Sequence, residues 1–328
     1  MNFAAVRTVF PGFLVCATIA AAASFLSEHY GGPPMLFAVL LGLALGSLRD
    51  APSLDAGIEF ASRGVLRLGV ALLGLRITFG DILAMGSQAV ILVVVGMVTT
   101  IALAIFLSRA MGLGRSFGAL TGGSVAVCGV SAAMAISAVL PRTQYSARDM
   151  SFAVIGVTTL STLAMILYPL VVAALSFDDR QAGLFLGATI HDVAQVVGAG
   201  YSVSPPAGDA ATFTKLLRVA LLLPIVVILA ATLRAKAEAP ARRPPWLPWF
   251  LVVFAILVVV NSLVTLPAAP KAGLQQFAQM CLITAVAALG IRTSLKDLAA
   301  MGIRPVLLIV GETLYLAVLS IVLLLWLA

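Results

Sequence analysis

Charged side chains are scarce in this sequence. Only 10% of the residues are Asp, Glu, Lys or Arg, and 62% are hydrophobic, whereas soluble domains average about 25% charged and about 45–50% apolar residues. The runs 91–100 and 221–232 contain no charge at all. This shortage excludes an ordinary soluble fold. It predicts helices that lie in a lipid bilayer, where every backbone hydrogen bond has to be satisfied within the protein.

Residues that bind metals or perform catalysis are also few. The three cysteines, Cys16, Cys128 and Cys281, lie far apart in apolar stretches and form no CxxC pair, so we expect neither a disulfide framework nor a metal site. The sequence has no Walker A, HExxH or GxSxG motif, which argues against an ATP-driven pump and against the common hydrolases. We therefore expect a protein that is not an enzyme and has no cofactor, apart from a coupling Na⁺ or H⁺.

Basic residues exceed acidic ones and give a net charge of +7, but they stand singly between apolar runs. Such charges orient membrane proteins rather than bind nucleic acid. With a cytoplasmic N-terminus and every segment spanning, fourteen of the 20 basic residues fall on the cytoplasmic side. This distribution predicts a multi-pass protein of the bacterial inner membrane with its C-terminus outside. The first apolar run resembles a signal peptide, but the many spans that follow favour an uncleaved helix.

The length of the apolar runs predicts about eleven membrane segments. No soluble domain fits between them, so residues 1–328 are predicted to form one all-α, polytopic transporter domain. The longest polar break, 234–245, is predicted to be a surface loop. The predicted segments are 9–27, 34–48, 64–80, 87–108, 115–140, 149–176, 180–203, 213–234, 247–266, 274–291 and 303–327.

An internal repeat relates the two halves of the chain. Residues 73–86 read LGLRITFGDILAMG and residues 289–302 read LGIRTSLKDLAAMG, with seven of the fourteen positions identical. Each copy ends one apolar segment and leads into the next. The copies follow the third and the tenth segments, so we expect them on opposite faces of the membrane. Inverted repeats of this kind are typical of secondary transporters.

Two segments rich in glycine and small polar residues, 115–140 and 180–203, interrupt the apolar pattern. Glycine disfavours an unbroken helix, so both are predicted to contain non-helical backbone at membrane depth, as transporter sites do. Two alternatives stay open for them. They are either broken spans or re-entrant hairpins that enter from opposite faces, and hairpins would raise the cytoplasmic share of basic residues to fifteen.

The candidates for substrate or ion binding lie in these two segments. His191 and Asp192 form an ionisable pair in an apolar stretch, and such residues mark sites in membranes, although a helix cap is the alternative. In a continuous helix, Thr189, Asp192 and Gln195 would share one polar face. The small residues of the first segment either expose N–H groups and hydroxyls or let helices pack closely. The full set is Gly122, Gly123, Ser124, Cys128, Gly129, Ser131, Thr189, His191, Asp192 and Gln195.

Four further polar residues lie outside the glycine-rich segments. Arg76 and Arg292 occupy equivalent repeat positions, each followed five residues later by Asp, and we interpret them as interfacial anchors rather than as anion ligands. Glu312 and Asn261 lie inside apolar runs, and we expect both to face the interior of the bundle.

Two of these motifs resemble a known family. Residues 128–133 (CGVSAA) resemble the pattern ICGxSAI, and residues 187–200 (GATIHDVAQVVGAG) resemble GxxIHEVAQVVAAG. Both patterns are typical of the YeiH-type family of bacterial membrane proteins, which is named for proposed sulfate export. The resemblance covers nearly the whole chain, with Asp192 where the family has Glu and Val127 where it has Ile.

The resemblance implies a fold and a mode of action. The family is grouped with the cation/proton antiporter, bile-acid symporter and citrate-carrier folds. In those folds, inverted repeats place crossing or hairpin segments in a core domain beside a panel domain, and transport proceeds by an elevator-like movement.

We therefore expect a secondary transporter of a small anion such as sulfate, a sulfonate or a carboxylate. Half-helix N-termini would attract the anion, and either His191 or Asp192 would couple a proton or exposed carbonyls would bind sodium. A channel or a non-transporting receptor is the alternative, and an intramembrane enzyme is the weaker one. The expected partners are the anion and the lipid bilayer, without nucleic acid. The oligomeric state stays open, with a homodimer as one option.

Overall fold

The structure is a computed structural model that describes residues 3–141, 146–233, 249–264, 267–293 and 302–327. Every regular element within these ranges is a helix, which confirms the predicted all-α class. Six of the described helices are long and apolar enough to cross a membrane, and shorter apolar helices accompany them. The predicted surface loop 234–245 lies outside the described residues.

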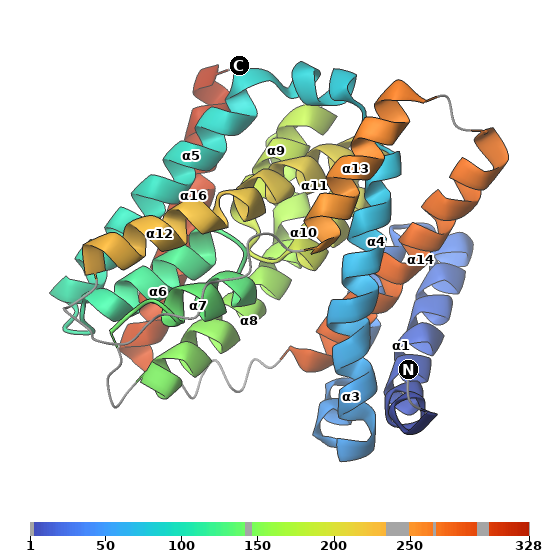
Figure 1. Ribbon diagram of the computed structural model, residues 1–328, viewed down its shortest axis with the longest axis horizontal. Helices are drawn as coiled ribbons and strands as arrows, with labels where there is room; N and C mark the ends of the chain where they lie inside the picture. Colours follow the sequence, from blue (N-terminus) through green and yellow to red (C-terminus); the bar gives the residue numbers. More distant parts are fainter. Residues whose placement is uncertain (1–2, 142–145, 234–248, 265–266, 294–301, 328) are drawn as a thin grey trace.

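One set of helices, which we call the α14 group, forms one side of the molecule in Figure 1. Glycines bring its backbones into direct contact: a Cβ atom on Gly12 would lie 2.0 Å from the Leu54 carbonyl oxygen, and one on Gly42 would lie 2.4 Å from that of Ala287. Small residues are the usual means of close helix packing in membranes. The group comprises α1 (Phe3–Tyr30), α2 (Pro34–Ala44), α3 (Pro52–Phe60), a π-helical turn (Ala61–Val65), α4 (Leu66–Leu72), α13 (Trp249–Leu263) and α14 (Ala268–Arg292).

The third predicted segment, 64–80, has to be corrected. Its helix begins at Pro52, more than two turns before the predicted start, and continues through the π-helical turn into α4. A search for long apolar runs misses the first part of this helix, because charged residues occur at positions 55, 59, 63 and 67. Two of them, Arg63 and Arg67, line a cavity.

The remaining helices, which we call the hairpin group, surround the two glycine-rich segments on the other side of the molecule (Figure 1). Helices α5 and α16 pack against each other along their length, and α11 packs against both α9 and α10. The group comprises α5 (Phe79–Ala110), α6 (Arg115–Ala126), α7 (Val130–Ser137), α8 (Ser146–Ala174), α9 (Asp179–Thr189), α10 (Val193–Val203), α11 (Pro205–Ala220), α12 (Leu222–Leu233) and α16 (Ile303–Leu327).

Both glycine-rich segments are re-entrant hairpins. In the first, the helix stops at Ala126 and restarts at Val130, with Gly129 in the left-handed region at φ 62°. Helix α7 folds back on α6, because a Cβ atom on Gly123 would lie 2.2 Å from Cδ1 of Ile136. In the second, the Ser204 hydroxyl after α10 donates to Asp179 at the start of α9 at 2.6 Å, so the two ends of this segment meet. The predicted break in helical backbone is confirmed.

The hairpins enter the bundle from opposite faces. Helix α5 crosses from one face to the other, and the first hairpin begins where α5 ends, where the Ser108 hydroxyl donates to the Gly114 carbonyl oxygen at 2.6 Å. The second hairpin begins near the start of α5, because a Cβ atom on Gly86 would lie 3.7 Å from the Arg180 guanidinium. Of the two alternatives left open by the sequence, the structure therefore has re-entrant hairpins.

The repeat is visible in the backbone as well. Gly86 and Gly302, the last residues of the two copies, both adopt left-handed conformations, with φ 62° and φ 87°. Each is followed by a long apolar span, Gly86–Ala110 in α5 and Ile303–Trp326 in α16. These spans start from opposite ends of the bundle, and the chain termini also lie at opposite ends (Figure 1). The predicted inverted relation is thereby confirmed for the described residues.

Candidate functional site

The tips of the two hairpins meet inside the hairpin group. A Cβ atom on Gly129 of the first tip would lie 3.6 Å from the His191 carbonyl oxygen of the second. The His191 ring is fully buried, with Nδ1 3.2 Å from the Val125 carbonyl oxygen and Nε2 3.0 Å from the Thr313 hydroxyl. This side chain therefore fastens the two tips to each other and to α16.

Two buried basic residues on α11, Lys215 and Arg218, also hold the tips together. The carbonyl groups that they bind belong to the last turns of α6 and α9 and to the residues that follow, which have no partner within their own helices. Positive charge at a helix C-terminus is favourable, and it compensates for the cost of burying two charges in a membrane. Lys215 Nζ donates to the carbonyl oxygens of Val127 and Ile190 at 2.7 and 2.9 Å. The Arg218 guanidinium donates to those of Val125, Ala126, Gly187 and Ile190 at 2.7, 2.9, 3.1 and 3.0 Å.

The sequence-based charge count assigned Lys215 and Arg218, near the start of the predicted segment 213–234, to the non-cytoplasmic side of the membrane, whereas the structure buries both side chains. Their side chains are 0% and 1% exposed, because α11 begins at Pro205 and carries them to membrane depth. The sequence did contain a signal that these two residues belong inside the bundle. The two residues are three positions apart, so they share one helix face, and they border the uncharged run 221–232.

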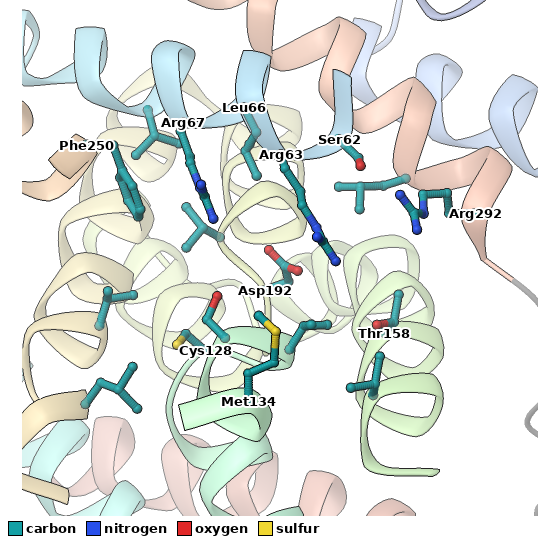
Figure 2. Close-up of a pocket in the computed structure, with 18 of the residues that line it drawn as sticks. Ser62, Arg63, Leu66, Arg67, Cys128, Met134, Thr158, Asp192, Phe250 and Arg292 are labelled. Atoms are coloured by element: carbon teal, nitrogen blue, oxygen red, sulfur yellow. The ribbon is translucent and has the colours of Figure 1, made fainter. Parts of the chain in front are cut away.

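A cavity of about 320 Å³ lies between the hairpin tips and the α14 group. Figure 2 shows the guanidinium groups of Arg63 and Arg67 extending from the α14 group toward Asp192, with Arg292 on the same side. Cys128 and Asp192 line the cavity from the hairpin tips. Charged groups from both sets of helices therefore meet in one place.

Positive charge dominates this cavity. Three arginines face one carboxylate, and the acid that pairs with Arg63, Glu59, lies one turn earlier on the same helix. The Nη1 atom of Arg292 is buried and has no hydrogen-bond partner among the described residues. A buried donor without a partner is costly. Arg292 thus brings to the cavity wall a guanidinium whose donors are not all used by the described residues.

Two helices begin at the cavity wall. Asp192 caps α10 by accepting a hydrogen bond from the Ala194 N–H at 3.3 Å, whereas Gly129 gives α7 no side-chain cap. The first residues of α7, Val130 and Ser131, line the cavity. Uncapped N–H groups and the helix dipole make this end of α7 favourable for an anion.

The structure brings only part of the predicted site to the cavity. Cys128, Ser131 and Asp192 line it, and Gly129 forms the break beside it. Thr189, Asp192 and Gln195 do not share the polar face that a continuous helix would give them, because the helix ends at Thr189 and restarts at Val193.

The other predicted residues support the hairpins from within. Ser124 and Thr189 donate to carbonyl groups of their own helices, both at 2.6 Å. Gln195 donates to the Thr162 hydroxyl at 3.3 Å. Gly122 and Gly123 are packing positions, where an added Cβ atom would lie 2.4 Å from the Ala104 Cβ and 2.2 Å from the Ile136 Cδ1.

The two repeat arginines occupy different environments. Arg292 lines the cavity. Arg76 pairs with Asp209 of α11 at 3.2 Å and lies 5.0 Å from the centre of the Tyr201 ring. It thereby joins the α14 group to the hairpin group. Asn261 faces inward as expected and donates to the Ile77 carbonyl oxygen at 3.1 Å.

Apolar spanning helices around two facing re-entrant hairpins define a polytopic α-helical membrane protein. The family model described as Conserved hypothetical protein 698 matches residues 11–309. UPF0324 membrane protein TauZ of Paracoccus denitrificans is 50% identical over 95% of this chain and 94% of its own length. UPF0324 inner membrane protein YeiH of Escherichia coli is 34% identical over 85% and 81%. The chain belongs to the UPF0324 family of membrane proteins, which confirms the resemblance noted from the motifs.

Proposed function

We propose that this protein is a secondary transporter of a small anion, and that the cavity between the hairpin tips and the α14 group is its binding site. The observation that carries the proposal is a cavity that three arginines, Arg63, Arg67 and Arg292, line with a single carboxylate, where Nη1 of Arg292 has no hydrogen-bond partner among the described residues. An unsatisfied guanidinium beside an uncapped helix N-terminus suits an anionic ligand.

The geometry of the groups supports an oxyanion as the substrate. A guanidinium binds sulfate-like, sulfonate and carboxylate groups through two parallel hydrogen bonds. The cavity volume of about 320 Å³ is at the lower end of the range of about 300–1,000 Å³ for ligand pockets. We therefore propose sulfate, a sulfonate or a small carboxylate rather than a large amphipathic anion.

The position of the cavity supports a carrier over a channel. Its lining residues come from both groups of helices, so movement of the hairpin group against the α14 group would carry one wall of the site with it. On the other side of the hairpin tips, His191, Lys215 and Arg218 are buried and hydrogen-bonded. In this proposal the hairpin group is the core, the α14 group is the panel, and one transport domain is formed by both.

For the location, we propose the bacterial inner membrane with the N-terminus in the cytoplasm and the C-terminus outside. The distribution of basic residues supports this orientation, and the name of the Escherichia coli relative places that protein in the inner membrane. We also propose transport rather than catalysis, because the cavity offers donors for an anion rather than an activated nucleophile. We propose transport rather than receptor function, because the cavity lies between two groups of helices that can move against each other.

The test is uptake of labelled anions by proteoliposomes that contain the purified protein. We expect saturable flux that is stimulated by the same anion on the opposite side. Arg292→Gln should raise KM by about tenfold to a hundredfold, because a hydrogen bond to a charged group is worth about 1.5–3 kcal/mol. Arg115→Gln, an exposed arginine at the start of α6, is the matched control. An unchanged KM in Arg292→Gln would place the site elsewhere, and flux that never saturates would favour a channel.

A further inference from the structure

A carboxyl group that the cavity does not use lies in the middle of α16. Glu312 is 0% exposed. Its Oε1 atom accepts a hydrogen bond from the Thr121 hydroxyl of α6 at 2.8 Å, and its Oε2 atom has no partner among the described residues. Neither Glu312 nor Thr121 lines the cavity. This carboxyl group is therefore a polar feature separate from the proposed anion site.

Apolar side chains surround Glu312 along α16. Ile309 and Leu316, about one turn before and after it, pack in one cluster with Val125, Val157 and Leu160. Its titratable neighbour is His191, which contacts the adjacent Thr313. Charged residues on the helices that pack against α16 lie only in their end turns: Asp81 and Arg109 on α5, Arg115 on α6, Arg148 and Asp149 on α8, and Asp179 and Arg180 on α9.

A second buried oxygen without a partner faces the same region. The hydroxyl of Thr100 on α5 is fully buried and makes no hydrogen bond within the described part of the chain. A Cβ atom on Gly96 would lie 3.1 Å from Leu316. Because α5 and α16 run antiparallel (Figure 1), Thr100, one turn further along α5, lies level with Glu312. The Thr100 carbonyl oxygen is also 3.4 Å from the Cβ position of Gly122, the neighbour of Thr121.

We infer that Glu312 is the proton-binding site that couples transport, a step that rests on the proposed function. An ionised carboxylate without a nearby cation is costly inside a membrane, whereas one proton converts the carboxylate to a neutral acid. The acid's O–H group is a donor, and the facing helix carries the Thr100 hydroxyl, which has no partner among the described residues and does not hydrogen-bond Glu312 in this structure. The carboxylate takes up a proton from one side of the membrane and releases the same proton to the other.

One turn of α16 connects this proton site to the anion site. Glu312 binds the first hairpin through Thr121, and the next residue, Thr313, binds His191 at the tip of the second hairpin. A change in the charge of Glu312 therefore acts on both hairpins at once. This assignment replaces His191 and Asp192 as the coupling groups, since His191 fastens the tips and Asp192 caps α10.

The first test does not depend on transport. Infrared difference spectra of the purified protein in liposomes, recorded across a pH titration, should show a carboxylic acid C=O band that disappears in Glu312→Gln. The band should persist in Asp192→Asn and in Glu28→Gln, an exposed acid near the end of α1. Glu312→Asp retains a carboxyl group and should keep a band at a shifted frequency, which shows that the loss is specific. A band that survives in Glu312→Gln, or that added sodium abolishes at constant pH, would overturn the proton assignment.

The second test uses anion flux in proteoliposomes. In Glu312→Gln, accumulation driven by a pH gradient should be lost, whereas exchange of anion for anion at equal pH should continue with the wild-type KM. Accumulation that persists in this variant would refute coupling through Glu312. If the wild type transports no anion at all, the proposed function fails, and the infrared titration still decides whether Glu312 binds a proton.

Discussion

Replacing Arg218 with methionine should destabilise the protein strongly, because this residue links the two hairpin tips. Its guanidinium donates four hydrogen bonds at 2.7–3.1 Å. Lys215 still donates to the carbonyl oxygen of Ile190, and His191 Nδ1 still lies 3.2 Å from that of Val125. The variant therefore leaves the carbonyl groups of Ala126 and Gly187 without this donor. Each buried carbonyl group that loses its donor costs about 1–3 kcal/mol, so we expect a loss of roughly 3–5 kcal/mol in the free energy of unfolding.

The measurement is thermal unfolding in detergent, followed with a thiol-reactive dye. Cys16, Cys128 and Cys281 are all buried and free, so each reports the loss of structure around it. With a shift of about 2 °C per kcal/mol, at the lower end for large chains, the unfolding temperature should fall by roughly 6–10 °C. Arg218→Lys should fall less, because it keeps the charge but lacks the planar fork of donors.

Arg115→Met is the matched control for this experiment. Arg115 is exposed at the start of α6, in the same hairpin, and surface substitutions usually change stability by less than about 0.5 kcal/mol. If Arg218→Met unfolded at the same temperature as Arg115→Met, the contacts between α11 and the hairpin tips would contribute no net stability, and our account of the buried cations would be wrong.

Two further predictions concern packing and topology. Gly122→Ala should lower the unfolding temperature, because the added Cβ atom would lie 2.4 Å from that of Ala104. Gly311→Ala should not, because an added Cβ atom there has nothing within 4 Å. Equal unfolding temperatures for the two variants would show that Gly122 has no packing role. In a background without native cysteines, Gly80→Cys and Ile303→Cys should react with an impermeant reagent from opposite sides of the membrane, and reaction from one side would refute the inverted repeat.

Much of the fold was predictable because it depends on features that the sequence states directly. Apolar length indicates most of the helices, and the glycines of the two interrupted segments indicate where helical backbone stops. The choice between broken spans and hairpins was not predictable from these signals. It depends on which surfaces meet, such as Ile136 against Gly123 and Ser204 against Asp179, and on contacts between residues far apart in sequence, which local composition does not encode.

The candidate site was predictable only in part, for a related reason. Asp192 and Ser131 were found because they lie in the glycine-rich segments. Arg63 and Arg67 were missed as site residues, because isolated basic residues next to an apolar run are equally typical of a membrane interface. Lys215 and Arg218 were missed because their compensation comes from carbonyl groups of two other segments, and no side-chain pattern in the sequence reveals those acceptors.

Neither hairpin is free to lift away from the other. Lys215 and Arg218 each hold carbonyl groups of both hairpins, so withdrawing one tip would strand a buried charge and leave bare helix ends in the middle of the membrane. We therefore expect the two hairpins and α11 to move as one rigid unit. In the proposed transporter, opening a single hairpin would break these contacts, so we expect exchange of access along the boundary between the hairpin group and the α14 group.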